Sequence, residues 1–224
     1  MVLEFFKGGN DQTLEEIEAT IAEMLLINRH TFDLAINTVL GGTDPESVNK
    51  EVHKSDRRVN KAERRIRKEL VVHTSVHGGN ADLPRVLVAM SVIKDAERIG
   101  DYAKNIWDLA DGGVDLSEAD DIKHLRGLRD RTSRSLADAA RIYQERDSEG
   151  AHALIKTMDN WTSEYDNCVD QLMASDFSAR DAVSRALLCR YLKRITAHIM
   201  NVITSLVMPI HRLDYYDEDK ADRE

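Results

Sequence analysis

Aromatic residues, glycine and proline are all scarce in this chain of 224 residues. Aromatic residues make up 5% of it, with 11 glycines and 3 prolines, whereas charged residues make up 32%. Strands favour aromatic and β-branched side chains, and sheet proteins need many turns rich in glycine and proline. The composition therefore favours an all-α protein.

Positive charge is also in deficit, because the formal net charge is -9. A protein that binds nucleic acid by neutralising its phosphates needs an excess of lysine and arginine. We therefore expect no nucleic acid partner. A negative surface suits cations or basic partners better.

Long apolar runs are missing as well. No window approaches the roughly 18 to 20 consecutive apolar residues of a membrane-spanning helix, and the amino terminus lacks the apolar core of a signal peptide. We expect no membrane insertion and a cytoplasmic location. The two cysteines, Cys168 and Cys189, have no close spacing, which predicts reduced thiols rather than a disulfide or a zinc site.

Turn and capping residues divide the chain into six long helical patterns. Gly8 and Gly9 predict a break, after which Thr13 and Glu16 form a capping box, as Ser117 does with Asp120. The charged tail, residues 213–224, is expected to be disordered. The expected helices span residues 13–40, 45–73, 83–112, 117–146, 148–175 and 178–210.

An internal repeat relates the first three helices to the last three. Shifting the sequence by about 96 positions aligns Arg98 with Arg194 and Asn105 with Asn201. We predict two tandem three-helix bundles related by duplication, residues 11–112 and 116–212. A single six-helix array is the alternative.

Two acids interrupt an apolar helical pattern in residues 91–107. Glu97 and Asp101 are four residues apart, so both point to one face of the predicted helix. Carboxylates between packed helices lose hydration and repel each other, so they require a cation, a basic residue or a shared proton. Metal binding and pairing with the arginines of residues 57–67 are the two alternatives.

The run from Asp95 to Ile106, DAERIGDYAKNI, resembles the signature of the PhoU family, and the two-bundle layout is similar over nearly the whole chain. The resemblance implies a non-enzymatic, cytoplasmic homodimer that regulates phosphate uptake and phosphate-starvation signalling. Its partners would be a phosphate transporter component or a sensor histidine kinase. The resemblance also implies iron, manganese, magnesium or zinc held by paired carboxylate motifs on neighbouring helices.

The family's metal motif maps onto the first repeat with one substitution. Glu97 and Asp101 match one carboxylate pair, and Asp56 with Asn60 matches the other, where Asn60 replaces an expected aspartate. Glu63 lies near the helical face of Asp56 and could supply a further oxygen. These five residues are the predicted metal site.

The second repeat has lost the motif. Lys193 and Ala197 stand where the two acids are expected, so a second site would be degenerate. Lys193 could instead neutralise an acid of residues 148–175. The candidate ligands of a degenerate site are Asp159, Asp166, Asp170 and His198.

The other residues of the motif are predicted to be structural. Arg98 recurs as Arg194 where the acids are gone, which favours an interhelical hydrogen bond over a role in metal binding. Gly100, in mid-helix, predicts a close approach of two helices. Asn105 and Asn201 are predicted to be buried amide crosslinks.

Two other functions compete with a phosphate regulator. One is a metal-free helical adaptor whose acids form salt bridges and whose acidic face docks a basic partner. The other is a carboxylate-bridged di-metal oxidoreductase, which requires two Glu-x-x-His motifs, whereas Glu149 and His152 form the single match. The sequence has no glycine-rich phosphate loop and no nucleophile arrangement, so we do not expect an enzyme.

Overall fold

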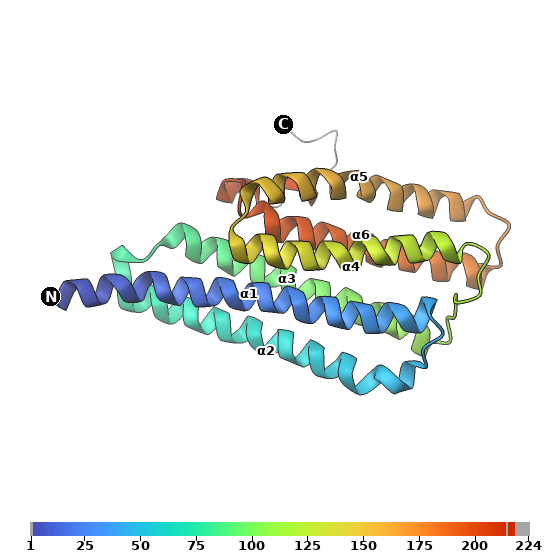
Figure 1. The fold of residues 1–224 in the computed structure, drawn as a ribbon, viewed down its shortest axis with the longest axis horizontal. Helices are drawn as coiled ribbons and strands as arrows, with labels where there is room; N and C mark the ends of the chain where they lie inside the picture. The colour runs from blue at the N-terminus through green and yellow to red at the C-terminus, as the bar shows by residue number, and fades with distance from the viewer. Residues whose placement is uncertain (1, 214, 218–224) are drawn as a thin grey trace.

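Six α-helices and three short 3-10 helices build the part of the chain that the structure describes. This computed structural model describes residues 2–213 and 215–217, with side chains for residues 12–213, 215 and 216, and that part contains no strand. The all-α prediction is confirmed. The helices are α1 Val2–Leu40, α2 Pro45–His77, η1 Gly78–Asn80, α3 Leu83–Asp111, α4 Ile122–Glu145, α5 Ser148–Met173, α6 Ala179–Thr204, η2 Ile210–Arg212 and η3 Tyr215–Asp217 (Figure 1).

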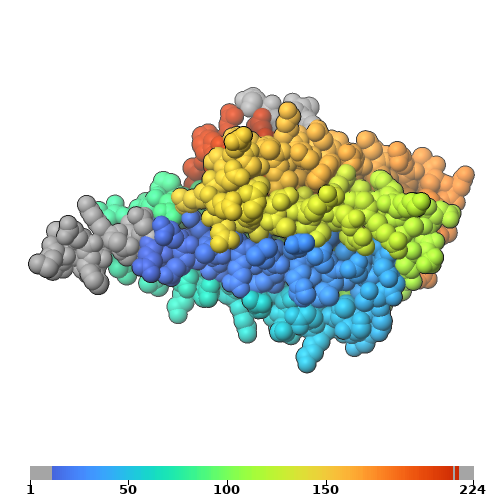
Figure 2. Space-filling model, viewed as in Figure 1, coloured from blue at the N-terminus to red at the C-terminus, as the bar shows by residue number. Residues whose placement is uncertain are grey.

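The helices form two groups of three that lie against each other. The groups are α1, α2 and α3, and α4, α5 and α6, and they meet where α1 packs on α4 and α3 packs on α6 (Figure 1). In the space-filling view the blue part of α1 borders the yellow-green α4 (Figure 2). One continuous hydrophobic cluster runs through both groups and includes Phe32, Ile66, Ile93, Leu136 and Leu192. Helix α3 ends at Asp111 and α4 begins at Ile122, so the groups follow each other along the chain while they share one core, and the division into two duplicated bundles stays a prediction.

Two helix starts differ from their predicted positions. Helix α1 begins at Val2 and continues through Gly8 and Gly9, because a mid-helix glycine costs about 0.5–1 kcal/mol but keeps its backbone hydrogen bonds. Helix α4 begins at Ile122 instead of residue 117. There, the Leu116 amide donates to the Val39 carbonyl at 2.8 Å, which holds the preceding segment against the end of α1.

Two other helix starts are confirmed. Asp44 caps α2 by accepting from the Glu46 amide at 3.3 Å, with Pro45 in the first turn. Asp82 caps α3 by accepting from the Arg85 amide at 3.3 Å. At the other end of the chain, α6 stops at Thr204, six residues before its expected end.

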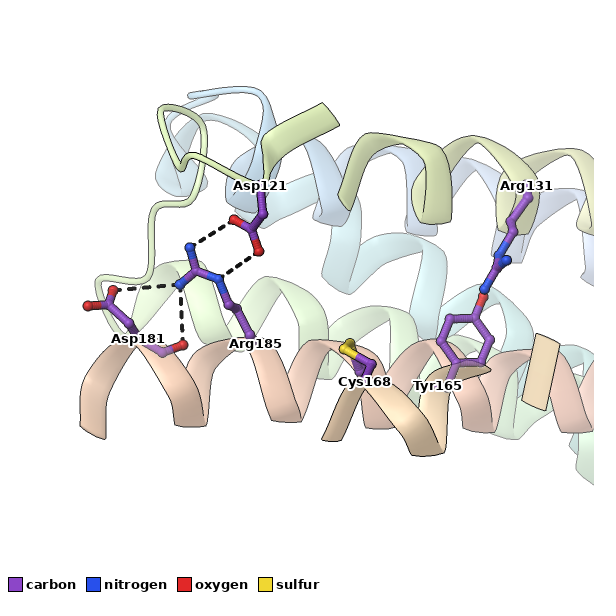
Figure 3. The surroundings of a disulfide bond; sticks show 7 residues. Asp121, Arg131, Tyr165, Cys168, Asp181 and Arg185 are labelled. Atoms are coloured by element: carbon purple, nitrogen blue, oxygen red, sulfur yellow. Dashed lines mark hydrogen bonds and ion pairs between the residues drawn. A yellow bond between two sulfur atoms is a disulfide. The ribbon is translucent and has the colours of Figure 1, made fainter. Parts of the chain in front are cut away.

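The two cysteines are joined, so the prediction of reduced thiols is wrong. Cys168 of α5 and Cys189 of α6 form a disulfide, with Cα atoms 6.7 Å apart (Figure 3). The sequence spacing gave no sign of the bond because the α5–α6 turn brings distant residues side by side. Beside the bond, the buried Arg185 guanidinium pairs with Asp121 at 2.9 Å and so ties α6 to the start of α4 (Figure 3).

The described helices include none that is long and apolar enough to cross a membrane. In the predicted charged tail, Leu213 is buried and residues 215–217 form η3. The remainder of that tail, residues 214 and 218–224, lies outside the described residues.

Candidate functional site

An acidic site lies between α2 and α3, which pack against each other in the first group. Glu97 and Asp101 come from α3, while Asp56 and Glu63 come from α2. The side chains of Glu97 and Glu63 are 12% and 8% exposed, so both carboxylates are largely removed from water. The helical periods therefore place the predicted first-repeat acids on facing sides of two neighbouring helices.

Electrostatic repulsion acts on Asp101. Burial raises the pKa of Asp101 above its ordinary value, and the neighbouring carboxylates of Glu97 and Asp56 raise it further. Lys94 and Arg98 lower the pKa of Asp101, but they offset only part of the rise. The three acids thus interact with one another, and their negative charge is not fully compensated at Asp101.

Lys94 supplies the main cation of the site. Its Nζ lies 2.6 Å from Glu97 Oε2 and 3.9 Å from Glu63 Oε1, so one ammonium contacts acids of both helices. Arg67 pairs with Glu63 at 2.8 Å. Asn60, which replaces the expected aspartate, donates from Nδ2 to Asp56 Oδ2 at 3.3 Å.

This arrangement does not fit a bound metal ion. Among the residues that the structure describes, no group of three or more His, Cys, Asp or Glu side chains is placed so that it could hold one. Lys94 instead lies against the carboxylate of Glu97. Metal binding by the five predicted residues therefore stays a prediction, and it requires that Lys94 move away.

In the second group, Lys193 neutralises an acid of α5, which confirms that alternative. Its Nζ lies 2.7 and 2.6 Å from the two carboxylate oxygens of Asp166. Asp159 and Asp170 also belong to α5, but His198 pairs with an acid of α3. The four candidates of the degenerate site thus do not form a metal-binding group in the described chain.

A polar network lies at the contact of α3 and α6, and it confirms Asn201 as a buried amide crosslink, whereas the sequence did not predict its other members. Asp95 Oδ1 accepts from His198 Nδ1 at 2.8 Å and from Asn201 Nδ2 at 3.0 Å. Arg194 Nη2 lies 3.3 Å from His198 Nε2, and the Tyr102 ring stacks on His198 with centroids 5.7 Å apart. Because arginine can only donate, His198 carries its proton on Nδ1. The network joins the two groups, and the repeat that aligns Asn201 with Asn105 was the available signal.

Gly100 lies at a close approach of α1 and α3. A Cβ atom at this position would lie 2.9 Å from Asn28 Oδ1, and Asn28 Nδ2 donates to the Ala96 carbonyl. Glycine thus leaves room for a buried amide that connects the two helices. Arg98 is exposed and Asn105 is half-buried.

The sequence model of the PhoU domain family matches residues 21–110, which include the acidic site. A curated relative, the phosphate-specific transport system accessory protein PhoU homolog of Clostridium acetobutylicum, is 25% identical over 130 residues. That match covers 56% of this chain, and the chain spans 59% of the relative's length.

Two solved structures share the fold over nearly the whole chain. PhoU from Pseudomonas aeruginosa matches with a TM-score of 0.75 at 19% identity and covers 88% of this chain and 96% of its own. The phosphate transport system regulatory protein PhoU from Streptococcus pneumoniae matches with a TM-score of 0.76 at 18% identity, over 96% and 98% of the two chains. These matches confirm the PhoU-like fold. Residues 21–110 thus match the PhoU domain model, and the chain shares the fold of these PhoU structures over nearly its whole length.

Proposed function

We propose that this protein regulates phosphate transport by binding other proteins and catalyses no reaction. The observation that carries the proposal is the PhoU domain at residues 21–110, with its acidic motif on α3, inside a fold shared with a phosphate transport regulatory protein over nearly its full length. The proposed partner is a phosphate transporter component or a sensor histidine kinase. The proposed setting is the cytoplasm, with the protein acting as a homodimer.

The ion pairs of the acidic site favour a regulator without metal, whose acids form salt bridges as they would in the adaptor alternative. Glu97 is paired with Lys94 at 2.6 Å, and Glu63 with Arg67 at 2.8 Å. Both carboxylates are largely buried, and removing the partner of a buried charge is strongly destabilising. In this form the acids hold α2 against α3, and the surfaces of the helices contact the partner.

Deletion of the gene tests the regulatory function. In phosphate-rich medium, cells without the protein should take up more radiolabelled phosphate and express a starvation reporter, and a plasmid copy should restore both values. A complementing Lys193→Gln variant is the matched control, because it alters only an exposed pair of the second group. Unchanged uptake and an unchanged starvation response in the deletion strain would reject the proposal.

Metal analysis tests the predicted cofactor separately. Iron, manganese, magnesium and zinc would be measured in untagged wild-type protein and in a Glu97→Ala/Asp101→Ala variant, with Asp159→Ala/Asp170→Ala as the control from α5. If the wild type holds a stoichiometric metal that only the first variant loses, the predicted metal site is supported. Lys94 must then move away from Glu97 when the metal binds. Equal metal content in all three proteins would reject that site and leave the metal-free regulator.

A further inference from the structure

A histidine pair lies near the end of α2, beyond the acidic site. His73 and His77 are four residues apart, so they share one face of the helix. Their ring centroids are 4.5 Å apart and the ring planes are inclined by 37°. The proposed regulatory function uses neither ring.

His73 is buried without a hydrogen-bond partner. His73 is 3% exposed, and in the described part of the chain neither of its ring nitrogens has a hydrogen-bond partner. A buried polar group left in this state is destabilising, so native proteins usually supply a protein group, a water molecule or an ion. The unpartnered ring beside a second imidazole points to a ligand between them.

The ring of His77 is oriented for binding through Nε2. Its Nδ1 lies 2.9 Å from the His73 carbonyl oxygen. Because a carbonyl can only accept, Nδ1 carries the proton, and in the neutral ring Nε2 carries the lone pair. Metal-binding histidines are commonly held in this way, with the second ring nitrogen donating to a backbone carbonyl.

We propose that His73 and His77 together bind one transition metal ion, such as Zn²⁺, Ni²⁺ or Cu²⁺, through one ring nitrogen each. Imidazole suits these ions. Two nitrogens bound to a tetrahedral ion at about 2.0–2.1 Å lie roughly 3.3 Å apart, which rings with centroids at 4.5 Å can reach.

The site is open, with water or a small anion as the further ligands. A cavity of about 350 Å³ borders both histidines and Glu69. No third protein ligand is in place in the described residues, so the ion exchanges readily instead of being locked in a closed structural site. Binding clamps two successive turns at the end of α2.

Metal titration of the untagged full-length protein tests the proposal. Zn²⁺ binding would be measured by calorimetry and by thermal melting, and Cu²⁺ binding by its visible absorption. The wild type should bind one equivalent, with a rise in melting temperature that grows with metal concentration. The half-buried His77 is the residue to change, because His73 packs against the core. His77→Ala, checked for folding by circular dichroism, should lose at least 10-fold in affinity.

Two controls separate this pair from other ligands. His152→Ala, which removes an exposed histidine of α5, and Glu97→Gln/Asp101→Asn, which alters the acidic site, should both bind as the wild type does. The proposal is overturned if the wild type binds no metal, if His77→Ala binds with unchanged affinity, or if the acidic-site variant loses the binding. None of these outcomes depends on phosphate regulation.

Discussion

The hairpins α2–α3 and α5–α6 hold equivalent places in the two groups, yet they carry different residues and ion pairs at matching positions. In the first, Glu97 pairs with Lys94 of its own helix, and Asp101 remains close to two other acids. In the second, Lys193 pairs across to Asp166, and alanine stands in place of Asp101. One hairpin therefore keeps a surplus of negative charge that the other has lost. Uncompensated charge costs stability, and such sites are more often kept for function than for folding.

The two hairpins also differ in how they are fastened. Helix α6 is bonded to α5 through Cys168 and Cys189, whereas α3 is packed closely on α1 at Gly100. The contact between α5 and α6 is a covalent bond, whereas the contact between α3 and α1 depends on close packing. Each can be removed by one substitution, so the comparison can be tested from both sides.

Removal of the disulfide should have the largest effect. A disulfide between residues 21 positions apart lowers the conformational entropy of the unfolded chain, which adds roughly 3 kcal/mol to the free energy of unfolding. In oxidising buffer, Cys168→Ser should therefore lower the melting temperature by about 6–12 °C. Under reducing conditions the variant and the wild type should melt together. Equal melting temperatures without reductant would show that α5–α6 does not depend on the bond.

Gly100→Ala should have the next largest effect. The added Cβ meets Asn28 Oδ1 at 2.9 Å, and Asn28 is buried and hydrogen-bonded to α3, so overpacking outweighs the gain in helix propensity. We expect a loss of about 1–2 kcal/mol in the free energy of unfolding, measured with urea. Gly127→Ala in α4 is the control, because a Cβ there meets nothing within 4 Å, and it should stabilise by about 0.5–1 kcal/mol. If both variants gained stability, the close approach at Gly100 would not be needed.

The two lysine pairs allow a direct comparison of the hairpins. Lys94→Gln leaves Glu97 largely buried without its cation, while Glu63 keeps Arg67, so we expect a loss of about 1–2 kcal/mol. Lys193→Gln breaks a pair whose Asp166 side chain is 53% exposed, and exposed pairs contribute about 0–1 kcal/mol. Urea unfolding of both variants measures the difference. Equal losses would contradict the view that burial distinguishes the two sites.

The features predictable from the sequence depend on residues within a few turns of one helix. Asp44 and Asp82 cap α2 and α3 as predicted because a cap involves only the next three residues. The helical period likewise predicts that Glu97 and Asp101 lie on one face of α3. The pairing of Lys94 with Glu97 was also available, because residues three apart on a helix are neighbours.

The features that could not be predicted depend on how distant helices meet. The sequence makes His198 a candidate ligand beside the α5 acids, yet the packing of α6 on α3 brings it to Asp95. Cys168 and Cys189 meet because two antiparallel helices align them, which no local spacing encodes. The spacing of His73 and His77 is visible in the sequence, but the lack of a hydrogen-bond partner for the His73 ring follows from how the surrounding helices bury it.

The smallest expected effect concerns Asp101, and its sign depends on pH. Burial and the charges of Glu97 and Asp56 raise the pKa of Asp101, while in the unfolded chain it titrates near its ordinary value of about 3.9. Between these two pKa values the folded state binds more protons, so stability falls as pH rises through this window, and the penalty is complete above it. Asparagine carries no charge, so Asp101→Asn should raise the melting temperature at pH 7 by about 1–2 °C, and the gain should vanish near pH 3.5.

Melting curves of the wild type and Asp101→Asn between pH 3.5 and 8 measure this effect, with Asp170→Asn on the exposed side of α5 as the control. The control should show no comparable gain. A gain in melting temperature that does not change with pH would mean that the substitution alters packing and not charge. A loss in melting temperature at pH 7 would mean that the charge of the carboxylate is compensated in the folded protein. A gain confined to neutral pH would show that the first hairpin keeps Asp101 at the expense of stability. Because Ala197 at the matching position shows that the fold does not need an acid there, such a result would place the reason for keeping Asp101 in binding rather than in folding.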